Sequence, residues 1–170
     1  RLAFDLVITN DTQRLNAAAK IQGNSRGRLS FTVFATAVSD FVTNRTGFTI
    51  LHPLENIVGQ PVDVTHTDGT QTLQRFPENI SPGQPIFDIR ALTHQVGPEL
   101  TATIFMEGAK FEMEDHRNWM DASFKTYSGS LLDPWPYIIE RGESISQTVT
   151  LTVSGLNQTT KVPPPQNHFC

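Results

Sequence analysis

Apolar and polar residues alternate along most of the chain with a period of two. The alternation is clearest over residues 2–8, 29–35, 48–51, 100–106 and 148–153, which are rich in Val, Ile, Thr and Phe. Successive side chains of a strand point to opposite faces, so this pattern predicts half-buried strands. Roughly ten to thirteen strands fit into about 160 residues, which is typical of a two-sheet sandwich or a barrel.

The residues between these runs favour turns. Asp68–Gly69 suits a tight type I′ hairpin, in which both central residues have positive φ. That hairpin would place Val64 opposite Leu73. A second turn is predicted at Asn24–Gly27. The alanine-rich segment Leu15–Lys20 is equally compatible with one helical turn or with a strand.

The composition narrows the classes of function. Hydrophobic residues make up 38% of the 170 residues, the net charge is -4 and the mean hydropathy is -0.26. Eleven Phe residues supply apolar volume for the core of one domain. No basic patch stands out, so we expect no nucleic-acid partner. No apolar run approaches the roughly 18 residues of a membrane span, so we expect no membrane partner.

Cysteine use and the two ends of the sequence add further expectations. The single cysteine, Cys170, excludes a disulfide within one chain and fits a reducing compartment, which predicts a cytoplasmic protein. The chain starts at Arg1 without a signal-peptide pattern. It also starts without Met, so we expect a longer parent protein with further domains. The Pro-rich run at 163–165 cannot join a central strand. We predict a β domain over residues 1–160 and a linker or loose tail over 161–170.

Residues 111–127 predict a charged hairpin, with two strands joined by a four-residue loop from Arg117 to Met120. The expected register pairs His116 with Asp121. One face of the hairpin would then carry Glu112, Glu114, His116, Asp121, Ser123 and Lys125. The other face would carry Phe111, Met113, Ala122 and Phe124. So many polar groups in one patch indicate the wall of a site.

Carboxylates near a histidine could bind a metal or share acid and base roles. Glu112 and Glu114 would lie about 7 Å apart along the strand, close enough for one to act as a general base beside the other. Lys125, placed opposite Glu112, would hold one carboxylate, and Trp119 at the loop tip can offer a surface for stacking a sugar. The alternative is a solvent-facing strand pair, whose cross-strand charge pairs contribute a few tenths of a kcal/mol each.

A second candidate lies at residues 44–53, where Arg45 and His52 flank an apolar strand. Arg45 can hold a carboxylate with two parallel hydrogen bonds. The alternative is a surface arginine and a histidine at the end of a strand. Further along, Asp88 and Arg90 share a strand face and are predicted to form a structural ion pair. The chain has no phosphate-binding loop, nucleophile elbow or zinc-protease motif, and we expect neither a cofactor nor a metal.

Three segments together resemble the amino-terminal portion of the D-apionate lactonase family. They are residues 44–53, Ile80–Pro85 and the hairpin at 111–127, and the resemblance spans roughly residues 28–153. This family comprises bacterial proteins of a pathway that degrades the branched sugar apiose. Its members are much longer than this chain and have a barrel-like central domain. The resemblance implies a β-sandwich that belongs to a larger lactone hydrolase and acts on a small sugar or sugar lactone.

The chain departs from the family pattern at two positions of the hairpin. The family typically has Gln where this chain has His116, and Thr or Ser where it has Met120. His116 is therefore a weak choice for an essential catalyst.

The resulting prediction is an all-β, two-sheet antiparallel sandwich. It could be of the large kind seen in sugar mutarotases, a comparison that rests on analogy of fold alone. In the leading hypothesis Glu112 and Glu114 catalyse lactone opening. The residues expected to bind substrate are Arg45, His52, Trp119, Asp121 and Lys125. Arg45 or Lys125 would stabilise the developing oxyanion. The second hypothesis is a carbohydrate-binding or domain-packing module without turnover, and the third is an epimerase-like activity that uses His52 or His94.

Overall fold

The computed structural model describes residues 2–155 and shows thirteen strands and one short 3₁₀-helix in that range. The elements run over Leu2–Asn10 (β1), Gln13–Gly23 (β2), Arg28–Ala37 (β3), Phe41–Thr43 (β4), Thr49–Pro53 (β5), Pro61–His66 (β6), Gln71–Arg75 (β7), Ile86–Gly97 (β8), Leu100–Glu107 (β9), Phe111–Asp115 (β10), His116–Trp119 (η1), Ser123–Ser128 (β11), Tyr137–Ile139 (β12) and Ser144–Ser154 (β13). The predicted linker at 161–170 lies outside the described residues.

Most strands belong to one large sheet. Eleven strands hydrogen-bond in the order β1-β2-β3-β13-β9-β8-β10-β11-β5, with β6 joined to β8 and β7 joined to β6. The pair β4 and β12 forms a separate small sheet. All of these pairings are antiparallel. The predicted all-β antiparallel class is confirmed, but the strands form one large and one small sheet rather than two sheets of similar size.

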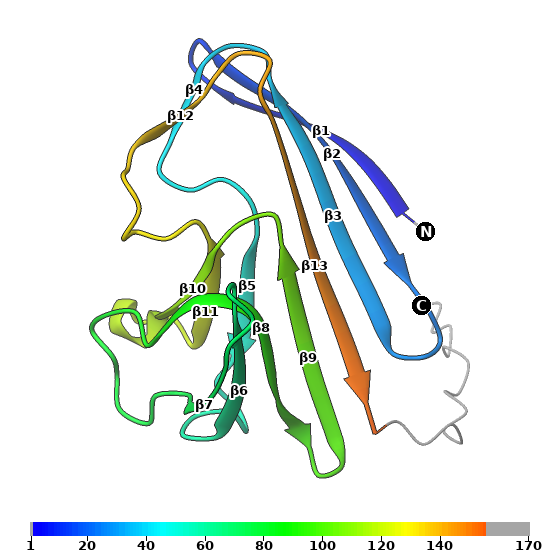
Figure 1. Cartoon of the computed structure of the whole chain (residues 1–170), viewed down its shortest axis with the longest axis vertical. Helices are drawn as coiled ribbons and strands as arrows, with labels where there is room; N and C mark the ends of the chain where they lie inside the picture. Colours follow the sequence, from blue (N-terminus) through cyan, green and yellow to red (C-terminus); the bar gives the residue numbers. More distant parts are fainter. Residues whose placement is uncertain (1, 156–170) are drawn as a thin grey trace, which may run out of the picture.

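The large sheet curls, so that β10 and β11 lie across from the long strands β3, β13 and β9 (Figure 1). The larger of two hydrophobic cores draws side chains from β6, β8, β9, β10, β11 and β13. Its most buried members, each at most 1% exposed, are Val62, Val64, Phe76, Ile86, Ile89, Leu92, Met106, Phe111, Met113 and Phe124. Strand twist accumulates across a sheet and allows one face to wrap around such a core.

A second core lies under the small sheet. Leu15 and Ala17 of β2 pack with Ala35 of β3, and Phe41 and Ile139 come from β4 and β12. The segment Leu15–Lys20 is therefore a strand, because its alternate residues are buried in this second core. The turn predicted at Asn24–Gly27 is also present, with Gly27 at a φ of 78°.

The strand register of the hairpin at Asp68–Gly69 differs by one residue from the predicted register. Val64 pairs with Thr72, and Leu73 pairs with Asp63. Gly69 has a φ of 87°, but Asp68 is not among the described residues with positive φ, so the turn is not type I′. The N–H of His66 bonds to the carbonyl of Thr70, which leaves a three-residue loop closed by a left-handed glycine.

The hairpin of β10 and β11 is present with a register shifted by two residues. Glu112 pairs with Tyr127 and Glu114 pairs with Lys125, whereas the prediction paired Glu112 with Lys125. The predicted four-residue loop is wrong because His116 starts the 3₁₀-helix η1, which is capped by Asp115 and closed by Met120 in a left-handed conformation. A shift of two residues leaves every side chain on its predicted face.

The predicted ion pair between Asp88 and Arg90 is absent from the ion pairs of the described residues. Asp88 has a φ of 53° and accepts a hydrogen bond from the Thr67 hydroxyl, while Arg90 lies over the ring of Phe105. The left-handed residue interrupts the alternation of faces, so the two side chains do not meet. Within residues 2–155, no helix has the length and apolar character needed to cross a membrane.

Candidate functional site

Arg45 is the centre of the charged cluster on the hairpin. It lies between β4 and β5, and its guanidinium reaches the outer face of β10. Nη1 donates to Glu114 Oε1 at 2.7 Å, and Nη2 donates to Glu112 Oε1. Nε donates to the carbonyl of Gly129 at 3.1 Å, and the guanidinium lies 4.6 Å from the ring centre of Tyr127. Arg45 thus contacts a carboxylate, as the sequence suggested, but it binds one oxygen of each of two glutamates rather than both oxygens of one.

Glu112 is completely buried, with 0% of its side chain exposed. Besides Arg45, it accepts a hydrogen bond from the Ser130 hydroxyl at 2.7 Å and one from the backbone N–H of Leu131 at 2.9 Å. A buried carboxylate is tolerated when it is paired and its oxygens are hydrogen-bonded. Glu112 therefore holds Arg45 and the 130–131 loop in place and has no open path to a ligand. The alternative considered from the sequence, a strand pair whose charged face is open to solvent, does not hold at Glu112.

Glu114 differs from Glu112 because 21% of its side chain is exposed. Its second oxygen, Oε2, lies 3.3 Å from Nε2 of His116, and that nitrogen lies 2.9 Å from the hydroxyl of Tyr127. Burial raises the pKa of Tyr127 above its usual value, although Lys125 and Arg45 act in the opposite direction. Tyr127 therefore keeps its proton at neutral pH and can donate it in a hydrogen bond to His116.

A pocket of about 170 Å³ opens beside Glu114. Its lining includes Ser81, Gln84, Glu114, Asn118, Trp119 and Leu131. Trp119 is 72% exposed at this pocket. Residues of the hairpin and of the Ile80–Pro85 segment thus line the same pocket. Arg45 does not line it but binds Glu114, which does. Its amide, carboxylate and aromatic groups are suited to a small polyhydroxylated ligand.

Asp115 and Arg117 form a buried ion pair that the sequence analysis did not single out. Arg117 Nη2 lies 2.6 Å from Asp115 Oδ2, and the side chain of Asp115 is 0% exposed. Burial alone would raise the pKa of Asp115, but hydrogen bonds from Arg117 and from the Ser81 N–H outweigh it and leave that pKa below its usual value. Asp115 shares the face of Phe111 and Met113, where a strand pattern predicts an apolar residue, so alternation alone does not reveal the pair.

Lys125 is paired with Asp121, four residues before it, and not with Glu112 as predicted. The hydrogen bond between them lowers the pKa of Asp121 and raises the pKa of Lys125. Because the register places Lys125 opposite Glu114, its charge faces the exposed carboxylate rather than the buried one. The side chain of Asp121 is 45% exposed, so this pair lies at the rim of the cluster.

His52 lies apart from this cluster, on the opposite face of the sheet. It pairs with Phe124, is 2% exposed, and its Nε2 is 2.8 Å from the Thr126 hydroxyl. The ring lies 6.3 Å from that of Phe76 and 6.4 Å from that of His94. Burial, followed by the nearby His94, lowers the pKa of His52 to about 4. The structure places it in the core, away from the pocket where it was expected to bind substrate.

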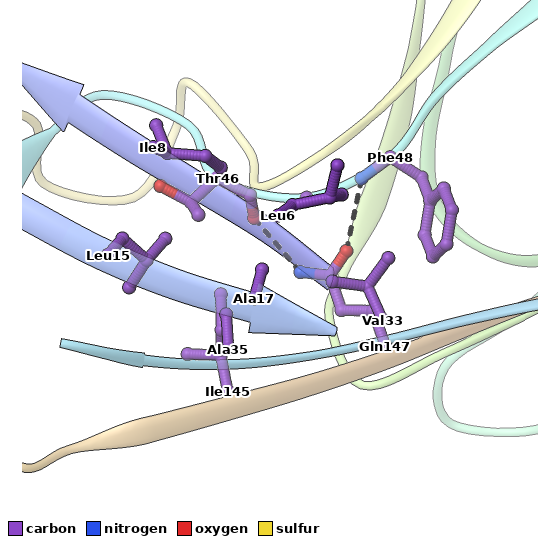
Figure 2. Close-up of a pocket in the computed structure, with 11 residues that line it drawn as sticks. Leu6, Ile8, Leu15, Ala17, Val33, Ala35, Thr46, Phe48, Ile145 and Gln147 are labelled. Carbon is purple, nitrogen blue, oxygen red and sulfur yellow. Dashed lines mark hydrogen bonds between the residues drawn. The ribbon is translucent and has the colours of Figure 1, made fainter. Parts of the chain in front are cut away.

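The backbone that carries Arg45 is tied to β13 by one buried amide. Gln147 is 6% exposed, donates from Nε2 to the Thr46 carbonyl at 3.0 Å, and accepts from the Phe48 N–H at 3.2 Å. Figure 2 shows both bonds beside an apolar pocket of about 200 Å³. Between them, Gly47 has a φ of 139°, and a Cβ there would lie 1.9 Å from Gln147 Oε1. Glycine is therefore required for this contact.

No group of three or more His, Cys, Asp or Glu side chains within residues 2–155 is placed to hold a metal ion. The guanidinium of Arg45 lies between the carboxylates of Glu112 and Glu114, so a protein cation occupies the place between them. The arrangement can present one partly exposed carboxylate, Glu114, next to amide and aromatic groups. Such a site can accept a hydrogen bond from water or from a ligand hydroxyl.

Comparison with solved structures gives weak likenesses of shape. A GalM/aldose epimerase homologue from C. elegans has a TM-score of 0.49 and 9% identity, covering 91% of this chain and 66% of that one. A putative aldose 1-epimerase from Escherichia coli K12 has a TM-score of 0.42 and 9% identity, covering 91% and 65%. Neither likeness bears on the activity of this chain.

Comparison of sequences gives a close match. Residues 1–156 match the family model described as D-apionate lactonase, N-terminal domain, a longer stretch than the expected 28–153. The D-apionate lactonase of Brucella anthropi is 46% identical over 144 residues, which cover 85% of this chain and 24% of that protein. The chain thus spans about a quarter of the length of this relative. The chain belongs to the D-apionate lactonase N-terminal domain family.

Proposed function

We propose that this chain is the amino-terminal domain of a longer bacterial sugar-lactone hydrolase, which opens the lactone of D-apionate or a closely related sugar lactone in carbohydrate catabolism. Family membership and the printed activity of the Brucella relative support this proposal. The relative is about four times as long as the matched region, so the remaining domains of the enzyme would be partners of this one. The single cysteine of the sequence fits a reducing compartment, and we place the enzyme in the cytoplasm.

One observation supports a direct role of this domain most strongly. The three segments that carry the family resemblance are far apart in sequence but meet around Glu114. Arg45 binds its first oxygen, and Ser81 and Gln84 stand across the pocket from the hairpin. Residues that served only to fold the domain would not need to converge on a partly exposed carboxylate.

In this proposal the two glutamates have different roles. Water adds to the ring carbonyl, the carbonyl carbon–ring oxygen bond breaks, and the ring oxygen takes a proton, giving a hydroxy acid. Glu114 accepts a hydrogen bond from the attacking water or from a substrate hydroxyl. Glu112 positions Arg45. Arg45 and Lys125 already donate to carboxylates, so we assign them to positioning rather than to oxyanion stabilisation.

The proposal is tested by lactone hydrolysis in the longer enzyme. We expect Glu114→Gln to lower kcat by a factor of about 100 or more, because the amide no longer accepts a proton. Circular dichroism should show an unchanged fold, because Gln has the shape of Glu and can still accept a hydrogen bond from Arg45. Full activity in the folded variant would remove Glu114 from the mechanism.

The second candidate function is a carbohydrate-binding module without catalysis, and the exposure of Trp119 favours it. A ring that is 72% exposed at a pocket can stack on a sugar in solution. In that case Trp119→Ala would raise KM and leave kcat unchanged, and Glu114→Gln would do the same. An epimerase-like site at His52 and His94 is not favoured, because the two side chains are 2% and 7% exposed.

A further inference from the structure

Arg117 ties the tip of the hairpin to a separate loop of the chain. Its Nη1 donates to the carbonyl of Glu78 at 3.0 Å, and its Nη2 donates to the carbonyls of Pro77 at 3.0 Å and Asn79 at 3.2 Å. A single planar guanidinium therefore binds three consecutive backbone carbonyls that lie about 40 residues earlier in the chain. Segment 77–79 runs directly into the loop that forms one wall of the pocket.

Asp115 completes the connection from the other side. It accepts from Arg117 Nε at 2.9 Å and from the backbone N–H of Ser81 at 2.9 Å. The guanidinium also lies 5.0 Å from the ring centre of Phe124, which shields it from water. Hydrogen bonds between charged groups are stronger than neutral ones, and more so where water is excluded. We name Asp115, Arg117 and their contacts with residues 77–81 the Arg117 clasp.

We propose that Arg117 is a positioning residue, which sets the place of the Ser81–Gln84 wall relative to Glu114 and so shapes the pocket for substrate. Ser81 is held by the clasp and also lines the pocket. Glu114 is held independently by Arg45. Loss of the clasp therefore moves one wall and leaves the carboxylate opposite it in place. This inference rests on the proposed function, because it assumes that the pocket binds substrate.

The first test measures the clasp itself by amide hydrogen exchange in the longer enzyme. Arg117→Lys keeps the charge but not the planar fork that reaches three carbonyls. We expect exchange in the peptide containing Ser81 to rise at least tenfold in this variant, because Asp115, which accepts from the Ser81 N–H, loses the guanidinium that holds it in place. Arg90→Lys is the matched control, since Arg90 also stacks on an aromatic ring but lies outside the pocket. Unchanged exchange in Arg117→Lys would overturn the proposal.

The second test measures kinetics on the lactone of D-apionate with the same variants. We expect Arg117→Lys to raise KM roughly tenfold with a smaller change in kcat, because substrate positioning is lost while Glu114 stays. Suppose that Arg117→Lys raises exchange but leaves KM unchanged, and that Glu114→Gln inactivates the enzyme. That result would overturn the inference and leave the proposed function standing. Normal turnover in both Glu114→Gln and Arg117→Lys would remove the direct role proposed for this domain in the reaction, and the inference with it. Absence of lactone hydrolysis in the unmodified longer enzyme would remove the proposed function itself.

Discussion

The two faces of the sheet region formed by β10, β11 and β5 both carry ionisable groups with little or no exposure, but in different surroundings. On the outer face, Glu112 and Glu114 both pair with the guanidinium of Arg45. On the inner face, His52 contacts the Thr126 hydroxyl and has no ion-pair partner among residues 2–155, and burial lowers its pKa to about 4, so it is neutral at pH 7. A nearby counter-ion favours the charged form of a buried group, whereas burial without one favours the neutral form.

A second contrast lies within the outer face. Glu112 and Glu114 are two residues apart on one strand and share the same arginine, yet only Glu114 reaches a pocket. Glu112 is enclosed by Ser130 and Leu131. The alternation of the sequence does not distinguish the two residues. The loop that follows β11 covers Glu112 and leaves Glu114 beside the pocket, which is the basis of the different roles proposed for them.

The largest expected effect comes from removing the buried member of the pair. Glu112→Ala would leave the partly buried Arg45 without one counter-ion and the Leu131 N–H without an acceptor, so we expect a loss of about 3–5 kcal/mol in the free energy of unfolding. Glu114→Ala should cost about 1 kcal/mol, because its side chain is partly hydrated. Urea unfolding of both variants measures the difference, and equal losses would contradict the contrast.

Because His52 is buried on the inner face, we expect the stability of the protein to depend on pH. The pKa of His52 is about 4 in the folded protein and 6.5 in the reference state, so the unfolded chain binds more protons between these values. The free energy of unfolding should fall by about 3 kcal/mol as the pH drops from 6.5 to 4. His94 acts in the same direction, because burial also lowers its pKa. Replacing His52 with Gln should flatten the curve, and an unchanged slope would refute this assignment.

Gly47 offers a sharper test of how the outer face is supported. In Gly47→Ala the new Cβ would collide with Gln147, and the backbone would be strained at a φ of 139°. We expect a loss of about 1–3 kcal/mol in the free energy of unfolding. Gly83→Ala is the matched control, since a Cβ there meets nothing within 4 Å. Equal stability of the two variants would show that the Gln147 contact does not constrain Gly47.

The smallest effect is expected at the rim of the cluster. Asp121 and Lys125 form an ion pair with one partner 45% exposed, and exposed pairs of this kind contribute little to stability. Lys125→Met should therefore change the free energy of unfolding less than any variant above, and the change should shrink in 1 M salt. A salt-independent loss as large as that of Gly47→Ala would place Lys125 among the buried supports of the site.

The alternation of residues was sufficient to predict most of the strands and the apolar face of the hairpin. That Arg45 could hold a carboxylate followed from the chemistry of its guanidinium, but not which carboxylates it would meet. The hairpin register was not predictable, because it depends on η1, which is capped by Asp115 and closed by a left-handed Met120. The Arg117 clasp was not predictable either, since three of its acceptors are backbone carbonyls, whose positions cannot be inferred from residue types. The hydrogen bonds of Gln147 with the backbone of Thr46 and Phe48 join positions about 100 residues apart, so they could be found only once the fold was known.

The most direct test of the account compares Glu112→Gln and Glu114→Gln in the longer enzyme, with kcat for lactone hydrolysis and the free energy of unfolding measured on the same samples. The account predicts that Glu114→Gln loses turnover at nearly unchanged stability, and that Glu112→Gln loses stability while the folded fraction retains turnover. Loss of turnover in the folded Glu112→Gln enzyme, together with full turnover in Glu114→Gln, would contradict it.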